Sequence, residues 1–173
     1  VRQYPLGTWV LSTEQGLQAH HLPFWLDTEA GEHGCLRAHV ARANPLWTAI
    51  ADGAPVLVIF RGAEAYLSPN WYPSKPETHR HVPTWNYQVV HVHGTLHLRD
   101  DEKFVRGVVA RLTRTHESLT GDARPWKMTD SAEDYIAQML AAIVGVEIRI
   151  EREADPATWI EGSVVDYVHD TRR

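Results

Sequence analysis

Alternating apolar and polar residues recur in short runs along the first hundred positions of the chain. A period of two is typical of β-strands with one buried face, and polar or glycine-containing turns separate the runs. The expected strands are Gly7–Leu11, Leu17–Leu26, Cys35–Ala41, Val56–Phe60, Ala65–Ser68 and Gln88–Leu98. Pro23 predicts an edge position or an irregularity in the second of them. Many short strands of this kind predict a barrel or a sandwich.

The second half of the chain changes to a helical pattern. Apolar residues recur at helical spacing over about 101–117 and 130–144, and acidic residues stand at the start of both segments. Asp130 and Glu133 form a capping-box-like start to the second helix, and Gly145 is expected to end it. Val146–Ile150 then alternates as a late strand.

Together these patterns predict a single α+β domain, mainly β with helices, over residues 1–173. The barrel or sandwich is expected to comprise about residues 5–98 together with the strand 146–150, and the C-terminal helices are expected to pack on it. A chain of this length has ample apolar material for one core.

Composition narrows the classes of function. A net charge of −5 and a pI near 6.1 give no electrostatic footprint for nucleic acid over the whole surface. No apolar run approaches the length of a membrane span, so no membrane association is expected. The single cysteine, Cys35, excludes an internal disulfide framework and suits a reducing cytoplasm, the expected location. The 11 histidines and 7 tryptophans are less ordinary, and both residue types are useful in a ligand pocket.

The segment His39–Pro45 (HVARANP) joins an expected strand to a short expected helix. Asn44 is a favourable N-cap, Pro45 is a favourable first helical residue, and Gly53 is expected to end the helix. The unpaired N–H groups of a helix N-terminus attract anions, and the Arg42 guanidinium suits a phosphate. The alternative is a plain strand–helix junction whose arginine pairs with a surface carboxylate. From this motif alone the plain junction is favoured.

A proline-rich stretch over 69–83 is expected to form a long structured loop. In and beside it stand four aromatic residues interspersed with polar ones: Trp71, Tyr72, Trp85 and Tyr87 with Ser74, Lys75, Thr84 and Asn86. Such a mixture is suited to stack on a flat ring while offering hydrogen bonds to its polar edge. The alternative is that the rings cover the end of the barrel.

Taken in order, these segments resemble the PaiB family of bacterial FMN-binding negative transcriptional regulators. The resemblance covers about Pro5–Ile150 and rests on HHLPFWLD, HVARANP, VLVIF, AYLSPNWYPSK, VPTWNY, VVHVHG and PW…DYI…AIVGVEI. It implies a split β-barrel of the flavin-reductase and pyridoxamine-phosphate-oxidase kind, usually a homodimer that holds FMN in a cleft between subunits. It also implies negative regulation of transcription, so DNA is a partner by resemblance alone.

The resemblance further implies which residues hold the cofactor. In related barrels, basic and small polar residues after a core strand hold the flavin phosphate, and this place corresponds to Arg42 and Asn44. The expected FMN-binding residues are His21, His39, Arg42, Asn44, Ser74, Lys75, Trp85 and Asn86. No catalytic residue is assigned because the sequence has no nucleophile motif, and no metal ligand is expected.

The chain departs from the family pattern at three places. It has His20 and His21 where the family commonly has Asn-His, so only His21 is carried over, and Ala38 replaces a glycine. The family's Lys-x-Ser-Gln-Asn segment is missing near Arg152–Ala154, where the late strand passes directly into a helical-looking stretch. If that segment helps to close the flavin site, its loss lowers the affinity for FMN.

Two other functions stay open on sequence grounds. One is an FMN-dependent oxidoreductase or flavin reductase, in which the cofactor supplies the redox chemistry. The other is a haem- or metal-binding split barrel, because His91, His93 and His97 fall on one strand face, as in a cupin-like metal site. A strand face that merely carries exposed histidines is the plainer interpretation of this spacing.

Overall fold

A computed structural model describes the backbone of residues 1–154. Seven strands form one antiparallel sheet in the order β2-β1-β5-β6-β7-β4-β3. The strands are β1 (Leu6–Thr13), β2 (Gly16–Pro23), β3 (Trp25–Asp27), β4 (Cys35–Ala41), β5 (Pro55–Leu67), β6 (Thr84–Arg99) and β7 (Ile143–Ala154). The helices are α1 (Leu46–Ala49), α2 (Lys75–Thr78), α3 (Glu102–Glu117) and α4 (Glu133–Ala141), with 3-10 turns η1 (Pro69–Trp71) and η2 (Met128–Asp130).

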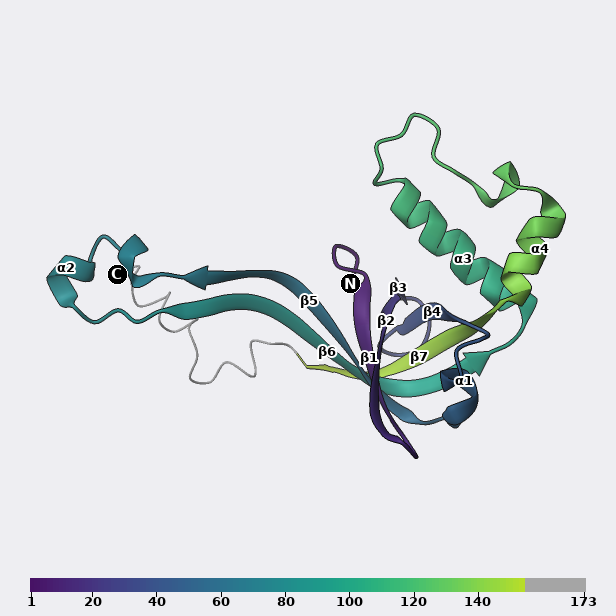
Figure 1. The fold of residues 1–173 in the computed structure, drawn as a ribbon, viewed down its shortest axis with the longest axis horizontal. Helices are drawn as coiled ribbons and strands as arrows, with labels where there is room; N and C mark the ends of the chain where they lie inside the picture. The colour runs from purple at the N-terminus through teal and green to yellow at the C-terminus, as the bar shows by residue number, and fades with distance from the viewer. Residues whose placement is uncertain (155–173) are drawn as a thin grey trace.

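The sheet curls on itself, so that β2 also lies against β4 although the two are far apart in the strand order (Figure 1). Each strand turns every second side chain inwards, which is why the sequence alternates. The enclosed core is apolar throughout and includes Trp9, Leu11, Phe24, Leu36, Val40, Val58, Phe60, Val92, Leu96, Val146 and Ile148. The expected α+β split barrel is therefore confirmed.

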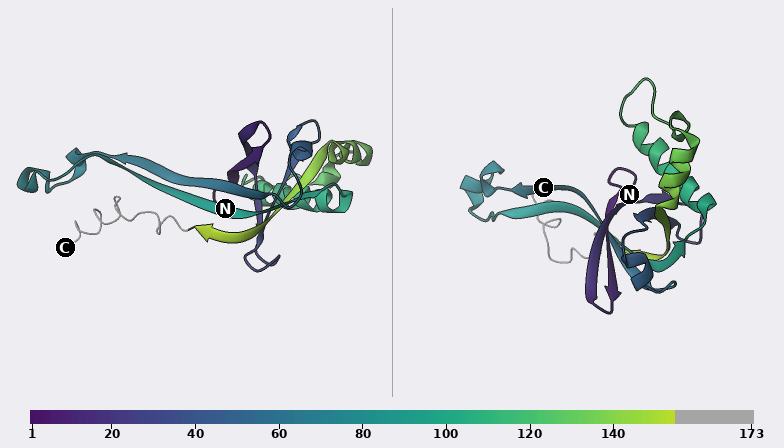
Figure 2. Two further views of the ribbon diagram at one scale, coloured as in Figure 1. Left: turned by 90° about the horizontal axis from the view of Figure 1, so that it is seen from below. Right: turned by 45° about the vertical axis from the view of Figure 1, so that its right-hand side comes forward.

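The helices α3 and α4 cover the outer face of β4 and β7. At the start of α3, the Asp101 carboxylate accepts the backbone N–H of Phe104 at 2.8 Å, so the acidic start is a true N-cap. Val105 on α3 packs with Ile136 and Leu140 of α4, forming a small second core outside the barrel. The helices leave the opposite outer face, on β1, β2 and β5, without a helical cover (Figure 2).

The hairpin of β5 and β6 continues far beyond the barrel. Past a register shift between Arg61 and Glu64, the two strands pair only with each other up to Leu67 and Thr84. Residues 62–87, which we call the arm, thus form a two-stranded ribbon whose tip carries η1 and α2, and both figures show it projecting away from the barrel (Figures 1 and 2). At its base, a Cβ atom on Gly62 would lie 2.7 Å from the Gln88 side chain, so only glycine fits there.

Several expected element boundaries are wrong. Pro23 does end β2 before the short β3, but the expected strands Val56–Phe60 and Ala65–Ser68 are one strand, β5. The helix after Arg42 ends at Ala49, not at Gly53, whose positive φ of 83° belongs to a following turn. Thr84–Tyr87, expected beside a loop, are paired residues of β6.

The fourth helix is also shorter than expected over 130–144. It begins at Glu133 after the 3-10 turn η2 and ends at Ala141. Gly145 does not end it but lies in β7, paired with His39. A Cβ atom there would lie 2.6 Å from the Phe104 ring, so this glycine lets α3 pack directly on the sheet. The helical-looking stretch expected after residue 154 lies outside the described residues.

Candidate functional site

A groove of about 430 Å³ lies on the uncovered outer face of the barrel. Cross-strand register explains how it forms: Thr8 on β1 stands between His21 on β2 and Ile59 on β5, and all three side chains point outwards. Its lining is Gln3, Tyr4, Pro5, Leu6, Thr8, His21, Ile59 and Arg61. The groove therefore offers an imidazole, a phenol and a guanidinium around an apolar floor, a mixture that suits a polar-edged ring ligand.

The arm presents a row of aromatic rings on one face. Tyr66 pairs with Trp85 in the ladder, and their rings meet edge to face at 6.0 Å between centroids. Tyr87 follows two residues after Trp85 and lies on the same face. These side chains stay 46%, 56% and 52% exposed, respectively, and the nearby Trp71 and Val82 are exposed as well. An exposed aromatic surface of this extent is typical of a binding interface.

The tip of the arm is organised around His81. Its ring stacks on Tyr72 at 5.1 Å, and its two nitrogens lie 3.2 Å from the hydroxyl groups of Ser74 and Thr78. Lys75 donates a hydrogen bond to the side chain of Asn70. The tip thus holds Ser74 and Lys75 in place through side-chain contacts of its own.

Arg42 is engaged by the protein itself. It forms a two-pronged ion pair with Asp100, and its Nε and Nη2 atoms donate to the carbonyls of Ala141 at 2.8 Å and Ile143 at 3.3 Å. The hydrogen bond with Asp100 raises the pKa of Arg42, and the same bond lowers the pKa of Asp100. Four of the five guanidinium N–H groups are thus used, which matches the plain-junction alternative.

The surroundings of Arg42 are acidic. The adjoining cavity has a volume of only about 140 Å³, and it is lined by the carboxylates of Asp100, Asp101 and Glu102. Three negative charges beside one paired guanidinium disfavour a further anion. Asn44 is also occupied, because its Oδ1 accepts the N–H of Leu46 at 3.0 Å and so starts the four-residue α1.

His39 lies on the helix-covered side of the sheet, where β4 alternation turns it outwards beneath α3 with Arg37. Its Nδ1 is buried and has no hydrogen-bond partner among the described residues. Burial lowers the pKa of this imidazole, so it is neutral at pH 7.

The structure divides the expected FMN-binding residues among three places. His21 lines the groove, whereas His39, Arg42 and Asn44 lie at the end of β4. Ser74, Lys75, Trp85 and Asn86 lie on the arm, which projects away from both (Figure 1). One copy of the chain therefore does not bring these residues together.

The histidines of β6 do not form a metal site. Among the residues whose side chains are described, no three histidine, cysteine or carboxylate groups lie close enough to hold a metal ion. His97 instead lies 3.4 Å from Asp52. His91 falls in register with Ile59 on the outer face of the barrel.

Of the eight residues that line the groove, the sequence identifies only His21; the residues that it misses include Tyr4 and Arg61. Arg61 pairs with Glu64 across the bulge where the arm begins. The signal available was weak, because an arginine directly after the apolar run Val56–Phe60 is equally typical of a strand that ends at the surface. No helix within the described part of the chain has the length and apolar character needed to cross a membrane.

The chain matches known proteins over most of its length. Residues 1–152 match the family model described as "Putative FMN-binding domain". The chain is 31% identical over 152 residues to the protease synthase and sporulation protein PAI 2 of Bacillus subtilis, covering 87% of this chain and 69% of that one. It is 38% identical over 104 residues to the uncharacterized yeast protein YKL070W, covering 59% of this chain and 61% of that one. The chain thus spans less than two thirds of the yeast relative.

Solved structures share the fold. The FAD- and haem-binding protein of Mycobacterium smegmatis superposes with a TM-score of 0.57 at 17% identity, covering 98% of this chain and 73% of that one. The flavocytochrome Anf3 of Azotobacter vinelandii superposes with a TM-score of 0.53 at 14% identity, covering 93% of this chain and 70% of that one. At such identities the likeness concerns the fold alone.

Proposed function

We propose that the chain, which belongs to the PaiB family of FMN-binding domains, binds FMN in sites that are shared between two copies of it. The observation that carries the proposal is the division of the expected FMN-binding residues between barrel and arm. Two copies related by a twofold axis would place the arm of each over the groove of the other, and both sites would then be equivalent.

The arm itself supports a second copy as its partner. An isolated two-stranded ribbon is at best marginally stable in water. Here the ribbon also exposes Tyr66, Trp85 and Tyr87 on one face. The groove contains the exposed side chain of Leu6 beside its polar groups. The aromatic rings on the arm of a second copy could pack against this apolar surface. Packing against a second barrel would bury both surfaces.

The residues present fit FMN. The aromatic face of the arm suits stacking on an isoalloxazine ring, and the groove supplies His21, Tyr4 and Arg61 to its polar edge. FMN supplies electron-transfer chemistry when bound, and the protein's part is to bind and orient it. The ring-covering arm would also exclude water from the ring.

For the phosphate we propose Lys75, with Ser74 beside it. Lys75 has no carboxylate partner among the described residues, whereas Arg42 is paired with Asp100 and faces two further carboxylates. A phosphate at Arg42 and Asn44, as the family resemblance implies, stays the alternative. It would have to displace Asp100.

Riboflavin separates these two assignments, because it has the ring of FMN without the phosphate. Lys75→Ala is expected to weaken FMN by about tenfold or more, the size of a charge-assisted contact, and to leave riboflavin unchanged. Arg42→Ala is expected to lower the melting temperature, because it removes the ion pair with Asp100, and to leave the affinities for FMN and riboflavin unchanged. Fluorescence titrations of both variants measure this. An FMN-selective loss in Arg42→Ala alone would assign the phosphate to Arg42 and Asn44.

We further propose that any effect on transcription is exerted without tight DNA binding by this chain alone. The chain is net acidic, and the exposed basic groups of α3 share their helix with Glu102 and Glu117. Duplex DNA is expected to bind weakly and with a steep dependence on salt. A salt titration with random and candidate operator duplexes measures this. Sub-micromolar, sequence-selective binding near physiological salt would establish direct repression instead.

The two remaining alternatives, a flavin reductase and a haem-binding module, can be distinguished by activity and by absorption spectrum. A flavin reductase would turn over a nicotinamide substrate on the bound flavin, and a haem module would show a Soret band when purified without added ligand.

A reducing cytoplasm is the location we propose, because Cys35 is a free, buried thiol whose pKa burial raises.

A further inference from the structure

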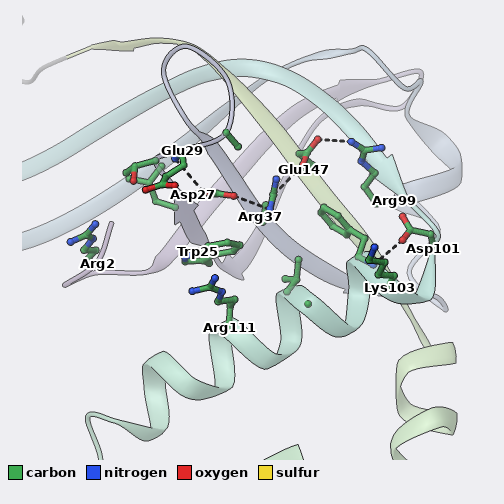
Figure 3. Close-up of a pocket in the computed structure, with 16 residues that line it drawn as sticks. Arg2, Trp25, Asp27, Glu29, Arg37, Arg99, Asp101, Lys103, Arg111 and Glu147 are labelled. Atoms are coloured by element: carbon green, nitrogen blue, oxygen red, sulfur yellow. Dashed lines mark hydrogen bonds and ion pairs between the residues drawn. The ribbon is translucent and has the colours of Figure 1, made fainter.

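A second cavity is not part of the groove or the arm. It has a volume of about 890 Å³ and lies between α3 and the strands β3, β4 and β7 (Figure 3). Although the chain has a net negative charge, five basic residues line this cavity: Arg2, Arg37, Arg99, Lys103 and Arg111. Only the N-terminal segment borders both hollows, with Arg2 here and Gln3 in the groove.

Guanidinium groups and aromatic rings alternate along the wall of this cavity. Arg111 lies over the Trp25 ring at 5.2 Å, and Arg37 lies 5.5 Å from the same ring. Arg37 also lies 5.5 Å from the Phe104 ring, over which Arg99 lies at 5.6 Å. This cation–aromatic ladder fixes the orientation of three guanidinium groups.

Two arginines of this cation–aromatic ladder, Arg37 and Arg99, form ion pairs with carboxylates. Arg37 contacts Asp27 at 2.9 Å and Glu147 at 3.1 Å, and Arg99 contacts the other oxygen of Glu147 at 2.8 Å. Glu147 is buried. The charges of these two arginines are therefore balanced by the carboxylates of Asp27 and Glu147.

The outer cations are not neutralised. Arg2, Lys103 and Arg111 make no ion pair among the described residues, and Figure 3 shows Arg111 reaching from α3 towards Trp25. Of the two remaining carboxylates in the lining, Asp101 already caps α3, and Glu29 is exposed at the rim. The cavity wall thus carries three exposed cations without a carboxylate partner among the described residues, and one of them, Arg111, lies over an aromatic ring.

We infer that this cavity binds a small organic anion that carries at least two negative charges. One of its anionic groups would contact Arg111, a second would face Lys103 or Arg2, which lie on either side of Arg111, and its remaining atoms would lie against Trp25 (Figure 3). Arg111 is suited to a bidentate contact because the Trp25 ring already holds its guanidinium plane. The site is distinct from the one proposed for FMN, and its occupant is a second ligand.

Calorimetric titration of the FMN-saturated protein tests this inference, because saturation removes the flavin site from the measurement. The probes are inorganic pyrophosphate and citrate, each added at constant ionic strength. At least one is expected to bind. Pyrophosphate alone would indicate a phosphate ligand, and citrate alone a carboxylate ligand. Failure of both to bind at millimolar concentration would overturn the inference.

Two matched substitutions on α3 locate the binding. Arg111→Gln is expected to weaken the bound probe about tenfold or more, because it removes a charge-assisted contact. Arg114→Gln removes an equal charge one turn further on, outside this cavity, and is expected to leave the affinity unchanged. Equal affinities in the two variants would show binding elsewhere and would refute the site. FMN affinity should stay the same in both, whether or not the proposed flavin site is correct.

Discussion

Glu147→Gln is expected to lower the free energy of unfolding by about 2–4 kcal/mol. The Glu147 side chain is only 5% exposed and bridges Arg37 and Arg99 beneath α3. Removal of one partner from a buried ion pair typically costs about 3–5 kcal/mol because the remaining charge is left uncompensated. The partial exposure of both arginines reduces the cost here. Urea denaturation followed by circular dichroism measures it.

The same carboxylate gives the stability a dependence on pH. Burial alone would raise the pKa of Glu147, but the hydrogen bonds and charges of Arg99 and Arg37 outweigh it and hold the pKa below its ordinary value. Its stabilisation is therefore complete above the unfolded-state pKa of about 4.3 and is lost as the pH falls through the lower folded-state value. Glu147→Gln should lose this acid-sensitive component.

Glu151→Gln is the matched control for this substitution. Glu151 lies four residues later on β7 and is exposed. Its carboxylate accepts a hydrogen bond from the Thr95 hydroxyl, which the glutamine carbonyl can still accept. Its replacement is expected to change the stability by less than about 0.5 kcal/mol. Equal effects of the two substitutions would show that the buried network under α3 contributes nothing particular to stability.

Trp85→Ala is expected to weaken FMN binding by about thirtyfold or more and to weaken the proposed dimer without abolishing it. Large aromatic side chains at the centre of an interface typically contribute about 2 kcal/mol or more, and Trp85 is 56% exposed in the single chain. FMN titration and sedimentation velocity at micromolar concentration measure the two effects. Tyr135→Ala, at a ring that is 52% exposed on α4, is expected to change neither.

The barrel could be predicted because its strands have one buried face. Cys35–Ala41 forms β4 with the expected bounds, since Leu36, Ala38 and Val40 are buried and the residues between them are not. The arm has no buried face. Thr84–Tyr87 alternates polar and aromatic residues, but the proline-rich stretch directly before it favours a loop in the sequence, so the strand is not predicted there. In the sequence, Gly145 has the features of a helix end. In the structure it instead makes room for the Phe104 ring, and this contact depends on packing between distant segments of the chain.

The candidate site could be predicted only in part for a similar reason. The sequence identifies Arg42 as a possible anion ligand, but its partner Asp100 comes 58 residues later and only folding brings the two together. Tyr4 and Arg61 carry no motif and lie beside His21 only because β1, β2 and β5 become neighbours in the folded sheet. The sequence therefore shows residue types that suit a flavin, but it does not predict that folding places some of them on the barrel and others on the arm.

The claim that each FMN site is made by two copies is tested most directly by mixing two defective variants. Thr8→Trp fills the groove of the barrel, where Thr8 stands between His21 and Ile59, and Trp85→Ala removes the ring from the arm. Each variant alone should bind FMN poorly. The two variants are refolded together in equal amounts, at a concentration at which sedimentation shows each of them to be dimeric. Random pairing then makes half of the dimers mixed, each with one intact site, so about one quarter of all sites should bind FMN normally. If native mass spectrometry shows mixed dimers and FMN titration finds no recovered sites, the flavin site lies within one copy and the account is wrong.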